Sequence, residues 1–389
     1  FPIEKFRELQ TPFYYYDTEV LRNTLNCIRA EVARYENFVV HYAVKANANP
    51  VILNEISSYG LGADCVSGNE ISAALSGGFN PKGIVFAGVG KTDEEIELAI
   101  ARGIYCIHCE SVQELMTIQK IASAMQTTAN VALRVNPNVD AHTHKHITTG
   151  TMANKFGLTV EEARRIIKNF DRYSNLNLFG LHFHIGSQIT EMNVFEELAQ
   201  RVNELQHDFY ANGEPAYLNL GGGLGINYQN PDSELIPPFM NYFDVFARNL
   251  NRNSWQSIHF ELGRSLVGQC GKLVTRVLYT KKMGSKNFAI VDAGMNALIR
   301  PALYGAYHRI VNTSTSSSKM ERYEVVGPLC ESTDILGTNV LMPVTQRNDV
   351  LEVLSCGAYA EAMSSRINLR DIPDYCFTNQ LQEKTITKT

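Results

Sequence analysis

The chain has 389 residues, of which 44% are hydrophobic, and it carries a formal net charge of −5. This length allows about two domains with sizeable cores, and the lack of a basic run argues against nucleic acid as the main partner. No apolar stretch is long enough to span a membrane and no signal peptide is visible, so we expect a cytoplasmic protein whose eight scattered cysteines are reduced thiols.

Eight stretches with strand-like patterns lie between residues 38 and 263. Segments with helical spacing separate most of them, such as Thr92–Arg102, Ser111–Met125, Thr159–Phe170 and Asn193–Tyr210. Several of these begin with Thr, Ser or Asn before acidic residues, as helix N-termini do. Eight strand-then-helix units predict an α/β protein with a (β/α)8 TIM barrel, and a doubly wound sheet is the alternative. The predicted strands are Phe38–Lys45, Leu61–Ser67, Ile84–Gly88, Ile104–Cys109, Val131–Asn136, Phe179–Gly186, Tyr217–Gly223 and Ser257–Gly263.

Lys45 ends the first predicted strand, which is otherwise mostly apolar. Even–odd alternation places His41, Ala43 and Lys45 on one face, which we expect to be the inner one. Desolvation favours the neutral form of an amine, and a neutral amine is a nucleophile that forms imines with carbonyl compounds. The alternative for an isolated lysine is a strand-end side chain that extends to water.

Polar side chains recur on the same face near the ends of later strands. Arg134 and Asn136 end the fifth strand, His184 lies near the end of the sixth, and Glu261 lies near the end of the eighth. Active sites of such barrels sit at the C-terminal ends of the strands, so these positions predict chemistry. The opposite face of the sixth strand, which we expect to meet the helices, comprises Phe179, Leu181, Phe183 and Ile185.

After the eighth strand the pattern changes to short β-like runs without long helices. We therefore expect a barrel over residues 24–266, followed by a β-sandwich or barrel-like domain over residues 267–389. Phe13–Asp17 near the start resembles another strand, so residues 1–23 are assigned to the β domain as well. The runs are Lys272–Lys282, Asn287–Asp292, Tyr323–Val326, Val340–Val344 and Val350–Ser355.

Three consecutive glycines, Gly221–Gly223, follow the seventh predicted strand. Such a run lets the backbone approach an anion closely, and barrels usually hold phosphate in the loops after strands seven and eight, although a glycine run alone is more often a tight turn. Glu261 beside a phosphate site would repel the ligand unless it faced a cation such as a pyridinium nitrogen. Lys45 for an imine, the ring of His184, a phosphate cradle and this carboxylate together predict pyridoxal 5′-phosphate as the cofactor.

Seven short motifs, in their order along the chain, resemble those of the pyridoxal-phosphate enzymes with the alanine-racemase-like fold, and among these the diaminopimelate decarboxylase family. The resemblance covers nearly the whole chain. It implies decarboxylation of meso-2,6-diaminopimelate to L-lysine and CO2, the last step of bacterial lysine biosynthesis. The motifs are Tyr42–Asn47, His184–Gln188, Gly221–Gly223, Glu261–Arg264, Arg300–Tyr304, Cys330–Asp334 and Gly357–Tyr359.

The resemblance implies that Lys45 holds the cofactor as an imine, that His184 stacks on its ring and that Glu261 pairs with the ring nitrogen. A carboxylate keeps that nitrogen protonated, whereas racemases of this fold place an arginine there, so the resemblance favours decarboxylation over racemisation. The other cofactor-binding residues that it implies are Ser187, Gly221, Gly222, Gly223, Gly263, Arg264 and Tyr359.

Cys330 matches the proton donor of the family, which is supplied across the interface of a homodimer with shared active sites. The alternative for a lone cysteine is a small core residue. Arg300 matches a residue that holds the distal carboxylate of an amino-acid substrate, and Glu331 would accept its distal ammonium group. The implied substrate-binding residues are Arg264, Arg300, Tyr304, Glu331 and Tyr359.

Two positions depart from the family pattern, because Ala297 is commonly acidic and Ile367 commonly aromatic. Decarboxylation of ornithine, lysine or carboxynorspermidine, or a non-catalytic pyridoxal-phosphate-binding homologue, therefore remain alternatives. His142–His146 contains three alternating histidines, but no carboxylate or cysteine stands at ligand spacing, so we expect no metal. Cys106 and Cys109 form a C-x-x-C within a predicted strand and should point to opposite faces, which argues against a redox site.

Overall fold

The computed structural model of the chain describes residues 3–140, 155–210, 215–315 and 317–378. The chain groups into two compact units, a barrel unit comprising Leu25–Gly225 and Pro238–Gly263, and a β unit comprising Phe1–Thr24, Ile226–Pro237 and Arg264–Thr389. The segment Ile226–Pro237 thus groups with the β unit, whereas the sequence-based division left it in the barrel. The histidines of His142–His146 lie outside the described residues.

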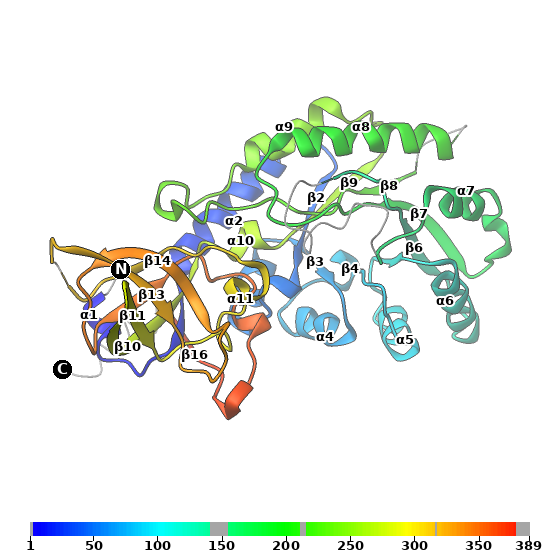
Figure 1. Cartoon of the computed structure of the whole chain (residues 1–389). Helices are drawn as coiled ribbons and strands as arrows, with labels where there is room; N and C mark the ends of the chain where they lie inside the picture. Colours follow the sequence, from blue (N-terminus) through cyan, green and yellow to red (C-terminus); the bar gives the residue numbers. More distant parts are fainter. Residues whose placement is uncertain (1–2, 141–154, 211–214, 316, 379–389) are drawn as a thin grey trace. The chain divides into compact units, whose positions relative to one another are not determined.

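The barrel unit is a closed barrel of eight parallel strands, with β2 pairing with both β3 and β9. This confirms the predicted (β/α)8 barrel, and α4 to α9 lie around the outside of the strands in Figure 1. The strands are β2 (Phe38–Ala43), β3 (Gly62–Cys65), β4 (Ile84–Phe86), β5 (Cys106–Cys109), β6 (Ala129–Arg134), β7 (Leu176–His182), β8 (Tyr217–Asn219) and β9 (Ser257–Leu262). The α-helices are α2 (Thr18–Val32), within which the two units divide, α3 (Pro50–Ser58), α4 (Gly68–Ser76), α5 (Asp93–Ala101), α6 (Val112–Ala124), α7 (Val160–Lys168), α8 (Met192–Phe209) and α9 (Phe239–Asn249). Short 3-10 turns are η1 (Val44–Ala46), η2 (Pro81–Gly83) and η3 (Phe170–Arg172).

Hydroxyl caps set the starts of three barrel helices. The side chains of Thr92, Ser111 and Thr159 each accept a hydrogen bond from the backbone N–H three residues later, at the first turns of α5, α6 and α7. Such caps satisfy backbone donors that otherwise lack a partner, which is why these sequence signals were reliable. The predicted start at Asn193 was wrong, because α8 begins at Met192 after Glu191, whose side chain makes no cap.

The prediction that Phe179 faces the helices is also wrong. The register between β6 and β7 shifts so that Leu178 and Gly180, but not Phe179, have partners in β6. Phe179 instead packs against Tyr105 and Tyr217, with ring centroids 5.3 and 6.2 Å away. Tyr105 also stacks on His259, which belongs to the predicted inner set, so this bulge moves Phe179 from the helix-facing to the inner set.

The β unit contains the predicted β domain. Its strands are ordered β12-β15-β10-β11-β13-β14, and β1 (Phe13–Tyr16), near the start of the chain, pairs with β10 and β16. The other strands are β10 (Gly271–Met283), β11 (Lys286–Val291), β12 (Ile310–Asn312), β13 (Met320–Val326), β14 (Ile335–Pro343), β15 (Val350–Val353) and β16 (Asp374–Phe377). Short helices and 3-10 turns are α1 (Ile3–Phe6), α10 (Arg264–Val267), α11 (Arg300–Tyr304), η4 (Pro231–Ser233), η5 (Glu361–Met363) and η6 (Ile367–Leu369).

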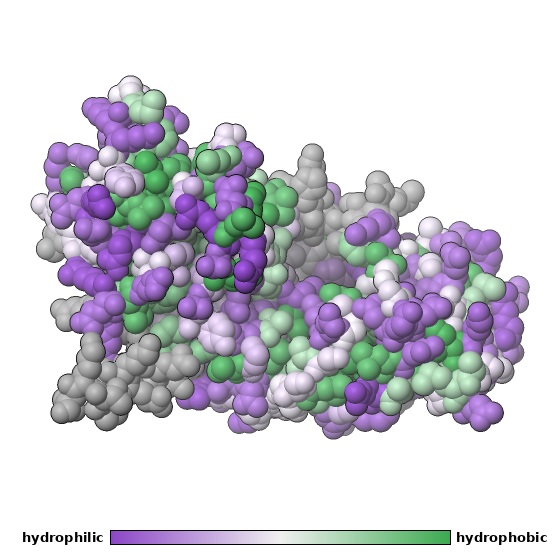
Figure 2. Space-filling model, turned by 90° about the horizontal axis from the view of Figure 1, so that it is seen from below, coloured by the Kyte–Doolittle hydropathy of each residue, from purple (hydrophilic) through white to green (hydrophobic). Residues whose placement is uncertain are grey.

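The described surface mixes polar and apolar residues. Figure 2 shows hydrophobic residues in several separate groups among hydrophilic ones on one face. Within the described part of the chain, every helix is too short or too polar to traverse a bilayer.

Candidate active site

Lys45 lies just beyond the end of β2, where its amine meets a buried carboxylate. The strand ends at Ala43 and not at Lys45 as predicted, because the chain turns into η1, which Asn47 closes by donating its N–H to the carbonyl of Val44. Lys45 Nζ lies 2.9 Å from Asp64 Oδ2, and the Asp64 side chain is fully buried. Burial and the nearby Glu261 raise the pKa of Asp64, whereas Lys45 lowers it. The turn therefore presents a partly exposed amine held by an acid.

Glu261, near the end of β9, is a buried carboxylate held by polar groups of the barrel interior. Asn219 Nδ2 donates to its Oε1 over 2.8 Å, and His182 Nε2 lies 3.1 Å from its Oε2. The Asn219 amide is oriented by a second bond, because its Oδ1 accepts the Gly221 N–H at 2.8 Å. Burial raises the pKa of Glu261, and the positive charge of Lys45 opposes this shift. A further cation beside this carboxylate would stabilise its ionised form.

The glycine run after β8 packs so closely against neighbouring backbone and side chains that a Cβ atom would collide with them. A Cβ at Gly222 would lie 1.8 Å from the carbonyl oxygen of Glu261, and a Cβ at Gly221 would lie 2.7 Å from His184 Nδ1. The Gly222 N–H donates to His184 Nδ1 over 3.2 Å, whereas the Gly223 N–H has no hydrogen-bond partner among the described residues. The run is thus a close-packed turn that leaves one backbone donor for an anion.

His184 follows the end of β7, so it lies in a loop and not within the strand as predicted. Burial, with the charges of Arg134 and Lys45, lowers the pKa of His184 well below its ordinary value. The ring is therefore neutral, and because Nδ1 accepts from Gly222, its proton is on Nε2. The glycine run also adjoins the loop that carries Ser187, since the Ile189 N–H donates to the Gly223 carbonyl over 2.9 Å.

Gly263 closes the far side of the Lys45 turn. A Cβ at this position would lie 3.0 Å from the Cβ of Ala46 and 3.1 Å from that of Ala43. The glycine thereby lets the end of β9 pack tightly on the residues that flank Lys45.

Sequence reasoning missed Asp64 and two further residues near the strand ends. Glu110, directly after β5, accepts from Arg134 Nη1 over 2.6 Å, and both side chains are buried. His108 Nδ1 lies 3.4 Å from Glu261 Oε1. Asp64 and His108 each interrupt an apolar pattern within a predicted strand, and Glu110 directly follows one. This signal could mark the positions, but it could not show which residues they contact.

In the β unit, two buried arginines meet around aromatic rings. Arg264 Nη1 donates to the Tyr228 hydroxyl over 2.6 Å, and the Arg264 guanidinium lies 4.7 Å from the centre of the Tyr359 ring. The Arg300 guanidinium lies 4.7 Å from the centre of the Tyr228 ring. No carboxylate within the described residues pairs with Arg300, and burial and the neighbouring Arg264 lower its pKa. A buried cation without an acid partner can bind an anion.

Cys330 and Glu331 lie in the exposed turn between β13 and β14. The buried Asp334 shapes this turn by accepting N–H bonds from Met295 and Leu329 at 2.6 and 2.7 Å. The Cys330 N–H donates to Asn368 Oδ1 over 3.1 Å. Hydrogen bonds from the Thr333 N–H and from the Ser332 hydroxyl lower the pKa of Glu331, which keeps it ionised.

The predicted residues therefore form two groups, each described within its own unit. The barrel brings Lys45, His184, Ser187, Gly221–Gly223, Glu261 and Gly263 to the carboxyl ends of its strands. The β unit carries Arg264, Arg300, Tyr304, Cys330, Glu331 and Tyr359. Of these, Arg264 and Tyr359 are in contact, and Tyr228 contacts both Arg264 and Arg300.

These features place the chain among the barrel enzymes that use a lysine amine and a buried carboxylate at the strand ends. A sequence model described as "Pyridoxal-dependent decarboxylase, pyridoxal binding domain" matches residues 21–268. The chain belongs to this family of pyridoxal-dependent decarboxylases, and within it to the diaminopimelate decarboxylase family.

Relatives and solved structures agree with this membership. The chain is 52% identical over 374 residues to a diaminopimelate decarboxylase of Bacteroides thetaiotaomicron, which covers 96% of this chain and 97% of the relative. A crystal structure of diaminopimelate decarboxylase from Helicobacter pylori, complexed with L-lysine, matches with a TM-score of 0.90 at 34% identity and covers 99% of both chains. A diaminopimelate decarboxylase structure from M. jannaschii matches with a TM-score of 0.90 at 35% identity, covering 97% of this chain and 89% of that one.

Proposed function

We propose that this protein decarboxylates meso-2,6-diaminopimelate to L-lysine and CO2 with pyridoxal 5′-phosphate as its cofactor. The observation that carries the reaction type is Glu261, a buried carboxylate whose oxygens are held by Asn219 and His182. When bound, the cofactor supplies a ring that accepts the electron pair released as a carboxylate leaves. A carboxylate beside the ring nitrogen would keep that nitrogen protonated, which suits decarboxylation.

The barrel residues fit this cofactor. Lys45 would bind it covalently through Nζ, with Asp64 positioning the amine. His184, neutral and oriented by Gly222, would lie against the ring, and Glu261 would pair with its nitrogen. The Gly223 N–H, which has no partner among the described residues, can donate to a phosphate oxygen. The neighbouring Gly222 packs so tightly that no side chain fits in this turn. The phosphate side would be bound by Ser187, Gly222, Gly223 and Tyr359, and the remaining cofactor-binding residues would be Gly221, Gly263 and Arg264.

The β unit supplies groups that suit the far end of the substrate. Arg300, buried without an acid partner among the described residues, would bind the distal carboxylate, together with Tyr304. Glu331, held ionised by its turn, would bind the distal ammonium group. Ornithine and lysine as substrates would place no carboxylate there, so the Arg300 site favours diaminopimelate. Arg264 and Tyr359 would contact the substrate near the cofactor.

We further propose a homodimer in which Cys330 and Glu331 act at the active site of the partner subunit. Both side chains are exposed, so the single chain does not engage them in its own core. Cys330 Sγ would donate a proton to the carbon that has lost CO2. None of the eight cysteines is joined in a disulfide, which suits a reducing compartment such as the cytoplasm.

Substrate profiling of the purified protein tests the proposal. We expect CO2 release from meso-diaminopimelate and little or none from ornithine or L-lysine, and we expect borohydride to fix the cofactor on Lys45. Equal turnover of ornithine would overturn the substrate assignment. Cofactor binding without CO2 release from any of the three amino acids would indicate a non-catalytic homologue.

A further inference from the structure

The contact between Arg300 and His308 fixes the proton on the histidine ring. His308 Nε2 lies 2.7 Å from Arg300 Nη1 in a buried setting. A guanidinium has only N–H donors and stays charged, so His308 Nε2 must be the acceptor. The other ring nitrogen, Nδ1, lies 2.9 Å from the carbonyl oxygen of Leu354, which can only accept. A single neutral tautomer, protonated at Nδ1, satisfies both contacts.

The neutral state of this ring is strongly favoured. Burial and the charge of Arg300 lower the pKa of His308 to about 3. Protonation would also turn Nε2 into a second donor against the guanidinium. The ring is therefore a fixed acceptor at physiological pH, and its partner carbonyl belongs to the backbone just beyond β15.

We propose that His308 is a positioning residue that orients the Arg300 guanidinium toward the distal carboxylate of the substrate. This inference rests on the proposed function. Arg300 Nη1 is held by His308, and the guanidinium lies over the Tyr228 ring, whereas the Arg300 Nε–H has no partner among the described residues. Such an arrangement leaves donors in one plane, as a carboxylate requires.

Tyr228 contacts all three of the other side chains, His308, Arg264 and Arg300. Its ring packs edge-on against His308, with centroids 4.9 Å apart, and its hydroxyl accepts from Arg264. His308 thus contacts the Arg300 guanidinium at Nη1, and the ring of Tyr228 lies under it. Neither is charged, so they can hold the cation without neutralising it.

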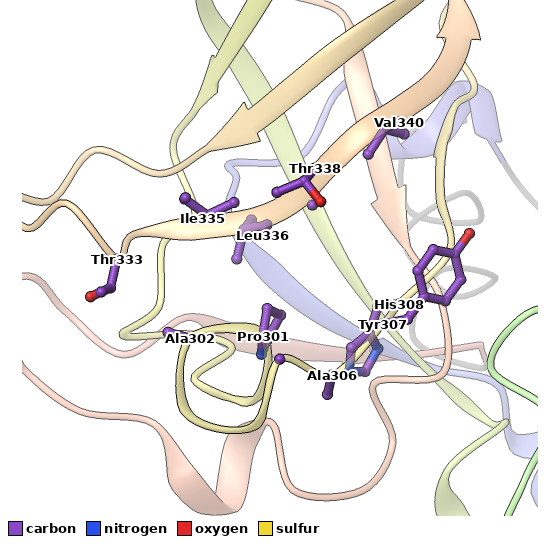
Figure 3. Close-up of a pocket in the computed structure, with 12 residues that line it drawn as sticks. Pro301, Ala302, Ala306, Tyr307, His308, Thr333, Ile335, Leu336, Thr338 and Val340 are labelled. Carbon is purple, nitrogen blue, oxygen red and sulfur yellow. The ribbon is translucent and has the colours of Figure 1, made fainter.

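A pocket of about 320 Å³ lies between the α11 segment and β14, and its lining includes His308, Pro301 and Leu336. Figure 3 shows His308 in the loop after α11, near Ala306 and Tyr307, with Ile335 and Leu336 across the pocket.

Ligand binding to the cofactor-loaded enzyme tests the proposal. L-Lysine keeps the carboxylate that Arg300 would bind, whereas cadaverine is the same chain without it. We expect wild type to prefer L-lysine, and His308→Leu to weaken L-lysine binding about tenfold or more while changing cadaverine binding less than about twofold. His308→Gln, whose Oε1 can accept in place of Nε2, should bind L-lysine within about threefold of wild type. Tyr307→Phe, at the exposed neighbouring position, is the matched control.

The outcomes distinguish a failure of the His308 proposal from a failure of the proposed role of Arg300 on which it rests. A wild type that does not distinguish the two ligands overturns the role of Arg300, and that of His308 with it. Discrimination that persists in His308→Leu overturns the role of His308 alone. Nitrogen-15 spectra of the histidine rings in wild type give an independent readout, with His308 expected to be protonated at Nδ1. A proton on Nε2 would overturn the proposal even if the leucine variant fails to fold.

Discussion

At the scale of single residues, the chemistry of the barrel depends on contacts between positions far apart in the sequence. Lys45 and Asp64 are separated by 19 positions, and Glu261 and Asn219 by 42. Alternation within one strand could point to Lys45 and Glu261, because each breaks an apolar pattern at a strand end. It could not supply their partners, since a partner is set by how neighbouring strands pair.

Replacing Glu261 by glutamine removes the charge while keeping the shape. We expect kcat to fall about 100-fold or more, because the group that would keep the cofactor ring positively charged is lost. Steady-state kinetics on cofactor-loaded enzyme measures this, with cofactor content confirming occupancy. Glu197→Gln makes the same change at an exposed position of α8 and should leave kcat unaltered. Activity of the Glu261→Gln enzyme within threefold of wild type would remove Glu261 from the mechanism.

Glu70, at the start of α4, should make stability depend on pH. Burial raises its pKa to about 7, although its carboxylate accepts the Val66 N–H at 2.8 Å. The folded state then holds a proton that the unfolded state releases, so the stabilisation is complete below about pH 4.5 and is lost as the pH rises through about 7.

Glu70→Gln keeps the acceptor and removes this dependence. Between about pH 5 and about pH 8, urea unfolding of the cofactor-free protein should show wild type losing on the order of 3 kcal/mol relative to the variant. Glu97→Gln, at an exposed position of α5, controls for the loss of one charge. Parallel pH profiles for wild type and Glu70→Gln would contradict the assignment.

At the scale of elements, helix starts were more predictable than strand ends. A hydroxyl cap is local, so Thr92, Ser111 and Thr159 mark their helices directly. A strand ends where its neighbour stops pairing, and for this reason β2 stops short of Lys45 and β7 short of His184. The short strands β12 and β16 were missed, whereas the equally short β4 and β8 were found because each belongs to a repeated strand-and-helix unit.

Glu95 caps the starts of two helices, so it should contribute more to the stability of the fold than an ordinary helix cap. Its Oε2 accepts the Thr92 N–H at 3.0 Å, and its Oε1 accepts the Gly68 N–H at the start of α4 at 2.7 Å. We expect Glu95→Ala to destabilise the protein by about 2 kcal/mol and Thr92→Ala by about 1 kcal/mol. Chemical denaturation measures both, and Glu97→Ala on the same helix should change stability by less than about 0.5 kcal/mol. Equal effects of Glu95→Ala and Glu97→Ala would rule out the double cap.

At the scale of the whole molecule, the fold class followed from the sequence, because eight repeats of strand and helix admit few arrangements. The assembly is a different question. Hydrophobic patterns in a sequence predict which residues a single chain buries. The turn with Cys330 and Glu331 is exposed, so such patterns cannot predict what it contacts. The role proposed for that turn depends on a second chain and needs an experiment on assembled enzyme.

Mixing two inactive variants tests the shared site. Lys45→Ala removes the amine and Cys330→Ala the thiol, so each homodimer should be inactive. If the partner supplies Cys330, a mixed dimer holds one site with both groups intact and one with neither. Random mixing makes half of the dimers mixed, each with one working site of two, so about one quarter of wild-type activity should return. Separately kept variants are the control. A mixture that stays inactive although mixed dimers form would mean that Lys45 and Cys330 of one chain serve the same site.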